Sequence, residues 1–207
     1  MRMWRLCSAL VALAVIGGVP AAKAYGEGPL RFSVVGDSLT AACELQLTAA
    51  QSCSWTGWVD AERDLVFAGG WAVWGARSDQ AAASAPPLRG DLVIAMLGTN
   101  DIAQSVPVET QFAALHDLTA GGTGAVLLLA IPPVASFYGT GAVETRNGEL
   151  EAFAEDQGWA FLDPWVRTQD GRWPDGASYD GVHPTDAVQQ EVGEIVADHI
   201  LDSGLGR

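Results

Sequence analysis

Lysine is almost absent from this chain of 207 residues: Lys23 is the only one, and ten arginines complete the 11 basic residues. Acidic residues number 25, so the formal net charge is −14 at pH 7. A chain this acidic repels the phosphates of nucleic acids and the headgroups of anionic membranes. Neither nucleic acid nor an anionic membrane surface is therefore expected among its partners.

Cysteine and histidine are also scarce, with three residues of each. Cys43 and Cys53 lie ten residues apart, and no histidine is close to them in the sequence, which disfavours a metal site. In an exported protein such a pair is expected to form a disulfide, and two free thiols are the alternative.

Long apolar runs are missing except near the N-terminus, where Leu6–Val19 is apolar. Met1–Arg5 carries two arginines, and Ala22-Lys23-Ala24 has the small-x-small form of a cleavage site. We therefore predict a secretory signal peptide over residues 1–24 and a single domain over residues 25–207. The apolar run is short for a membrane span, so the alternative of an uncleaved anchor is disfavoured. After cleavage all 25 acidic residues and eight arginines remain, a net charge of −17.

Strand-like and helix-like segments alternate along the rest of the chain. Five short apolar runs are typical of buried strands: Arg31–Gly36, Leu65–Ala68, Leu92–Leu97, Ala125–Ile131 and Trp159–Leu162. Apolar side chains at helical spacing follow over Val108–Leu118, Val143–Ala154 and Val188–Ile200. This alternation predicts an α/β sandwich around a parallel sheet.

Three short motifs stand at strand ends or in loops of this pattern. They are Gly36-Asp37-Ser38-Leu39, Gly98-Thr99-Asn100-Asp101 and Asp180-Gly181-Val182-His183-Pro184. Because parallel strands bring their carboxyl ends to one edge of a sheet, we expect all three motifs to face the same crevice.

The residue types in these motifs suit acyl transfer. A serine hydroxyl such as that of Ser38 needs a base to take its proton, and His183 can supply one. Asp180 can reach the other ring nitrogen of His183 and fix its tautomer. The uncharged amide of Asn100 suits stabilisation of an oxyanion.

Other polar residues near these motifs have simpler interpretations. Asp37 and Ser38 are common helix starters, so capping is the alternative to catalysis for that pair. We expect Asp37 and Asp101 to organise their loops. Trp71 and Trp74 can either line a substrate pocket or pack in the core, and core packing is the more common fate of such residues.

Taken together, the motifs resemble those of the SGNH hydrolases, also called GDSL esterases/lipases, from about Arg31 to the final helix. The resemblance implies a flavodoxin-like three-layer α/β/α sandwich with about five parallel strands. It implies Ser38 as nucleophile, Asp180 and His183 as the other triad members, and Asn100 in the oxyanion hole. It implies no metal and no cofactor.

The same resemblance implies that a glycine after the second strand donates its N–H to the oxyanion, beside the N–H of Ser38. Gly75 is our choice, because small and polar residues that can open a helix follow it, and Gly70 is the alternative. The asparagine that the family often carries shortly before this glycine is absent.

We therefore expect a secreted, monomeric esterase or lipase that acts on a small-molecule or glycan ester. An acyltransferase or a polysaccharide O-deacetylase that uses the same serine is the nearer alternative. A non-catalytic carbohydrate-binding protein on this scaffold is the more distant one.

Overall fold

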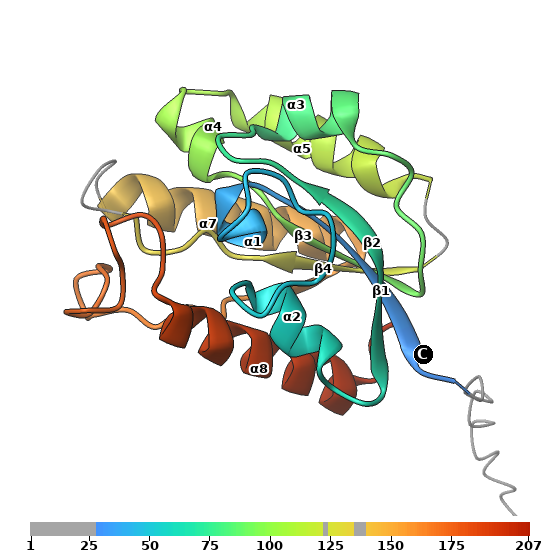
Figure 1. The fold of residues 1–207 in the computed structure, drawn as a ribbon. Helices are drawn as coiled ribbons and strands as arrows, with labels where there is room; N and C mark the ends of the chain where they lie inside the picture. The colour runs from blue at the N-terminus through green and yellow to red at the C-terminus, as the bar shows by residue number, and fades with distance from the viewer. Residues whose placement is uncertain (1–27, 122–123, 135–139) are drawn as a thin grey trace, which may run out of the picture.

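The computed structural model describes residues 28–121, 124–134 and 140–207, so the expected signal peptide lies outside the described residues. Strands and helices alternate within them (Figure 1). The strands are β1 (Leu30–Gly36), β2 (Leu65–Ala72), β3 (Leu92–Met96), β4 (Ala125–Leu129) and β5 (Ala160–Leu162). The helices are α1 (Ser38–Ala41), α2 (Trp55–Asp60), α3 (Ser78–Ser84), α4 (Thr99–Ala103), α5 (Val108–Thr119), α7 (Thr140–Gln157) and α8 (Asp186–Ser203).

The five strands form one parallel sheet in the order β2-β1-β3-β4-β5. This is the flavodoxin-like order, in which the chain reverses its direction of travel across the sheet between β1 and β3. The predicted fold class is thereby confirmed. In β1, Val34 pairs with Gly70 of β2 on one side and with Ile94 of β3 on the other.

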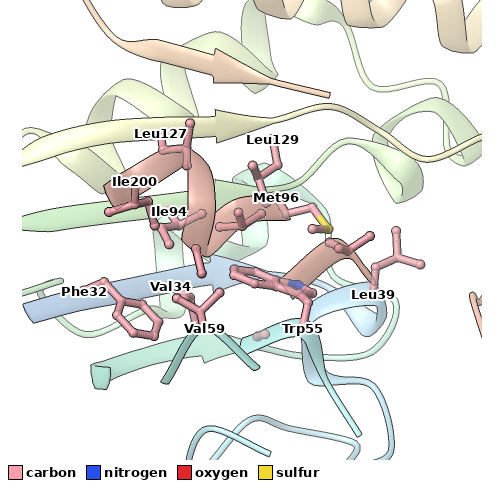
Figure 2. Packing of buried hydrophobic residues seen from close by; sticks show 14 of the residues in the cluster. Phe32, Val34, Leu39, Trp55, Val59, Ile94, Met96, Leu127, Leu129 and Ile200 are labelled. Atoms are coloured by element: carbon pink, nitrogen blue, oxygen red, sulfur yellow. The ribbon is translucent and has the colours of Figure 1, made fainter. Parts of the chain in front are cut away.

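Alternate residues of the strands enter two separate cores, one on each face of the sheet. Phe32 and Val34 pack on the face covered by α2 and α8, together with Trp55, Val59 and Ile200 (Figure 2). The opposite face packs against α3, α5 and α7, through residues that include Val35, Val93, Ala95, Ala81, Leu115 and Leu150. In Figure 1, α3 and α5 lie above the sheet and α2 and α8 below it.

Helix α8 is the long helix that lies next to the site described below. Its buried stripe consists of Val188, Val192, Val196 and Ile200, close to the predicted stripe. Gly193 allows α2 to approach closely, because a Cβ at this position would collide with Trp55 and Trp58. The buried side chain of Gln189 then joins three elements: it donates to the carbonyl of Leu39 in α1 and accepts from the N–H of Trp55 in α2.

The main departure from the predicted elements is β2, which runs on to Ala72 instead of ending at Ala68. Beyond Ala68, Gly69 and Gly70 still pair with β1, after a register shift between Phe32 and Ser33 that leaves Ala68 without a partner in the register. The other strands begin or end within two residues of their predicted limits. No helix in the described ranges is both long and apolar enough to cross a membrane.

Candidate active site

The three sequence motifs meet at the carboxyl edge of the sheet. Ser38 follows β1, Asn100 follows β3, and His183 lies in the loop that leads into α8. Because β1 and β3 border the position where the strand order reverses, Ser38 and Asn100 lie at the place where open α/β sheets form their binding crevice.

Ser38, His183 and Asp180 form a continuous chain of hydrogen bonds. The Nε2 atom of His183 lies 3.0 Å from the hydroxyl of Ser38, and its Nδ1 atom lies 2.8 Å from Oδ2 of Asp180. With Asp180 accepting from Nδ1–H, Nε2 is left as the acceptor for the serine proton. Ser38 is 8% exposed, so its hydroxyl lies just below the surface.

Asp180 is fixed by the backbone of its own turn. Its Oδ1 atom accepts from the N–H groups of Val182, at 2.9 Å, and of His183, at 2.7 Å. Although partial burial alone would raise the pKa of Asp180, these bonds and the one from the imidazole lower the pKa below its ordinary value of 3.8. The carboxyl is therefore ionised at neutral pH, as an acceptor for the imidazole requires.

The turn that presents Ser38 depends on the two residues before it. A side chain at Gly36 would collide with Thr40, so glycine is needed where the chain turns from β1 into α1. Asp37 is the N-cap of α1, and its Oδ1 atom accepts from the N–H of Leu39 at 3.0 Å. Ser38 is thus the first residue of the helix, where N–H groups have no partner within the helix.

Asp37 also holds Asn100. The Nδ2 atom of Asn100 lies 3.1 Å from Oδ2 of Asp37 and 3.0 Å from the carbonyl oxygen of Ala76, so its amide is bound from two sides. Burial raises the pKa of Asp37 to about 7, and the nearby Asp101 adds to the effect, while the N–H of Leu39 opposes it.

Asp101 has the loop-organising role that we expected. Its carboxylate accepts from the backbone N–H and from the hydroxyl of Ser78, the first residue of α3. Burial raises the pKa of Asp101, while the hydrogen bonds from Ser78 lower it. The contact ties the loop of Asn100 to the loop that follows β2.

Gly75 and Gly70 have different positions relative to this crevice. Gly75 lies in the loop after β2 with φ of +74°, next to Ala76, whose carbonyl binds Asn100. Gly70 lies inside β2, where it pairs with Val34, and a Cβ there would press on the Val34 carbonyl. Of the two glycines, Gly75 is therefore the one that adjoins the Asn100 amide.

A pocket of about 230 Å³ opens beside Ser38 and His183. Much of its wall comes from the disulfide Cys43–Cys53, which the structure contains, and from Trp74 and Tyr179. The pocket surface is mostly apolar. No group of three or more His, Cys, Asp or Glu side chains that could hold a metal ion occurs in the part of the chain that the structure describes.

The sequence did not indicate which tryptophan would reach this site. Trp71 is buried, as the core interpretation expects, whereas Trp74 is 45% exposed and stacks on the ring of His183. The centroids of the two rings are 5.4 Å apart, and their planes are 20° from parallel. Position next to Gly75 was the only sequence signal for Trp74.

Comparison with known proteins gives one family. The model of the GDSL-like lipase/acylhydrolase family matches residues 34–191, which include every residue of the hydrogen-bonded chain. No curated protein sequence matches the chain significantly.

Solved structures with the same fold include several hydrolases. A psychrotrophic esterase, EstA, from Pseudoalteromonas sp. is 21% identical, with a TM-score of 0.60, over 84% of this chain and 98% of that one. An α/β hydrolase from the metagenome of Lake Arreo, Spain, is 19% identical, with a TM-score of 0.63, over 87% and 97%. A member of the lipolytic protein G-D-S-L family from Veillonella parvula is 19% identical, with a TM-score of 0.60, over 83% and 96%.

Proposed function

This chain belongs to the GDSL-like lipase/acylhydrolase family, and we propose that it is a secreted serine hydrolase that cleaves carboxylic esters with Ser38 as its nucleophile. The observation that carries the proposal is the unbroken chain from Asp180 through His183 to Ser38, with heavy-atom distances of 2.8 and 3.0 Å. Both distances lie within hydrogen-bond reach, about 2.6–3.2 Å between heavy atoms, which a general base needs in order to take a proton.

Acylation begins when His183 takes the hydroxyl proton of Ser38 on Nε2 and the serine oxygen attacks the ester carbonyl carbon. The carbonyl π electrons move onto its oxygen, and an imidazolium forms beside the ionised Asp180. When the tetrahedral intermediate collapses, the bond to the alcohol oxygen breaks and His183 gives its proton to that oxygen. The acyl group remains on Ser38.

Deacylation repeats these steps with water in place of serine. His183 takes a proton from the water, and the hydroxide attacks the acyl carbon. Collapse of the second tetrahedral intermediate returns the proton to the oxygen of Ser38 and releases the carboxylic acid.

The oxyanion of both intermediates is stabilised by the N–H groups of Ser38 and Gly75 and by the amide of Asn100. The positions of Gly75 and Ala76 support this set, because they place the loop after β2 beside Asn100. Both N–H groups of the Asn100 amide already have acceptors, Asp37 and Ala76, so one of them must be shared with the oxyanion. Donors held in place in this way need little reorganisation during the reaction.

We further propose that the protein works outside the cytoplasm as a monomer, on a small-molecule or glycan ester. The signal-like sequence over residues 1–24 and the disulfide Cys43–Cys53 support an oxidising compartment. One structure of EstA shows that esterase inhibited by monoethylphosphonate, which supports the use of phosphorus-based serine probes here.

The test is a panel of esters, from acetyl to long acyl groups and including acetylated sugars, assayed with the wild type and with Ser38→Ala. Loss of hydrolysis in Ser38→Ala with an unchanged circular dichroism spectrum is the expected result. The exposed Ser52, changed to alanine, is the matched control and should keep full activity. Retained activity in Ser38→Ala would refute the proposal, and product analysis with a sugar acceptor present would separate hydrolysis from acyl transfer.

A further inference from the structure

Among the described residues, Trp74 is one of few large apolar side chains that remain exposed, and its indole N–H already has an acceptor. Its indole Nε1–H donates to the carbonyl of Ala42 at 3.1 Å, and its backbone N–H donates to the carbonyl of Leu45, also at 3.1 Å. One ring face stacks on the imidazole of His183. Trp74 is therefore held in a single place against the base of the proposed reaction.

The segment that holds Trp74 is closed by the disulfide. Between Cys43 and Cys53, the chain pairs with the end of β2: Gln46 forms an antiparallel bridge with Val73, and the N–H of Leu47 donates to Ala72. Val73 and Trp74 thus extend the chain beyond β2, along the disulfide loop. This pairing aims the Trp74 side chain at the crevice.

Trp74 separates two hollows of different character. The first is the apolar pocket of about 230 Å³ that contains Ser38, His183 and the disulfide. The second, of about 380 Å³, is more open and more polar, and Gly75, Trp71 and Gln80 line it. Among the described residues Trp74 alone lines both hollows, so this residue lies between them.

We propose that Trp74 sets the size limit of the apolar group that an ester substrate places beside Ser38. The inference rests on the proposed esterase function and adds the substrate class: esters with one short or compact apolar group. At about 230 Å³ the pocket is smaller than most small-molecule sites, which run from about 300 to 1,000 Å³, so it suits a short or compact group. A longer group meets the indole ring and has to leave the pocket.

The size limit can be tested with two series of esters and measured as kcat/KM. One series lengthens the acyl group from acetyl to dodecanoyl on a constant alcohol, and the other enlarges the alcohol of an acetate ester from ethyl to naphthyl. We expect the kcat/KM of the wild type to fall for the longer members of one series only. If this is the acyl series, the acyl group occupies the pocket; if it is the alcohol series, the alcohol group does.

Trp74→Ala should open the wall and shift the preference in that series. The ratio of kcat/KM for the longest to that for the shortest member should rise by about tenfold or more, which is the usual scale of discrimination by an apolar pocket. Trp74→Phe keeps a ring in place and should keep the wild-type preference. Leu45→Ala is the matched control, because this side chain is exposed and lines neither hollow.

A folded Trp74→Ala protein with an unchanged size preference in both series would overturn the inference alone. If Trp74→Ala does not fold, Trp74→Leu replaces it in the test, and we expect a smaller rise in the ratio of kcat/KM for the longest to the shortest ester. If the wild type hydrolyses no ester, alkyl fluorophosphonates of increasing alkyl length measure the same size limit as the rate of Ser38 labelling. A wild type that neither hydrolyses nor becomes labelled would overturn the esterase proposal and this inference with it.

Discussion

Replacement of Asp37 by asparagine should change how the stability of the protein depends on pH. Asp37 is buried, and its pKa is raised from 3.8 to about 7 in the folded protein. In the unfolded chain water surrounds the carboxyl, so its pKa returns to the ordinary value. Between pH 4 and pH 7, the folded state therefore holds a proton that the unfolded state has released.

The sign of the effect follows from this proton. Stability is reduced as pH rises wherever the folded state binds more protons than the unfolded state. The stabilising free energy from protonated Asp37 is thus fully present below pH 4 and is lost progressively up to pH 7. Above pH 7 this group causes no further change in stability. The gap between 3.8 and about 7 corresponds to about 4 kcal/mol in total, of which about 3 kcal/mol is lost between pH 5 and pH 8.

Urea unfolding of the wild type and of Asp37→Asn, followed by tryptophan fluorescence at constant ionic strength from pH 5 to pH 8, measures this loss. The asparagine amide cannot accept from Asn100 as the carboxylate does, but that cost does not vary with pH. Asp101, whose pKa is also raised by burial, titrates in both proteins, and its repulsion of Asp37 is part of the raised pKa of Asp37 that the comparison measures. The free energy of unfolding of the wild type should fall by about 3 kcal/mol relative to the variant. A difference that stays constant with pH would refute the reasoning.

Four further outcomes follow from the site. Replacing Cys43 and Cys53 together by alanine should lower the free energy of unfolding by about 2–3 kcal/mol, as chain entropy predicts for a loop of this length, and an unchanged urea midpoint would contradict it. Gly75→Ala keeps the N–H group, but φ of +74° is unfavourable for alanine, so we expect the N–H to shift from the oxyanion and kcat to fall by about tenfold or more; the stability cost should be only about 1 kcal/mol, because a Cβ meets nothing. Gly70→Ala should mainly lower stability, because its Cβ meets the neighbouring strand. A large loss of kcat in Gly70→Ala with normal kcat in Gly75→Ala would instead assign the oxyanion N–H to Gly70. Asp180→Asn should keep the contacts of this side chain with the backbone, but should favour the wrong tautomer of His183 and so lower kcat by about 10² or more. A variant with the kcat of the wild type would exclude Asp180 from the triad.

The sequence was sufficient where the signal is local. Apolar runs bounded by glycine predicted the buried strands, and apolar residues at helical spacing predicted α5, α7 and α8. The three motifs could be placed at one edge because parallel strands leave no other arrangement for their carboxyl ends. Helix α2 was not predicted, because six residues carry too little periodic signal, and α3 was indicated only by the small and polar residues after Gly75.

What the sequence could not provide are contacts between distant segments. The bond from Asn100 to Asp37 spans 63 residues, and the stacking of Trp74 on His183 joins the loop after β2 to the loop before α8. Apart from the position of Trp74 next to Gly75, the sequence does not distinguish it from Trp71, yet Trp74 is exposed and Trp71 is buried. The difference arises because β2 continues beyond Ala68 and pairs with the disulfide loop.

The nucleophile is the central claim, and mass spectrometry of the folded protein after reaction with a fluorophosphonate probe tests it most directly. Peptide mapping should place a single adduct on Ser38, and the adduct should be lost in Ser38→Ala and form far more slowly in His183→Ala. An adduct on another serine, or no adduct on the folded wild type, would contradict the account.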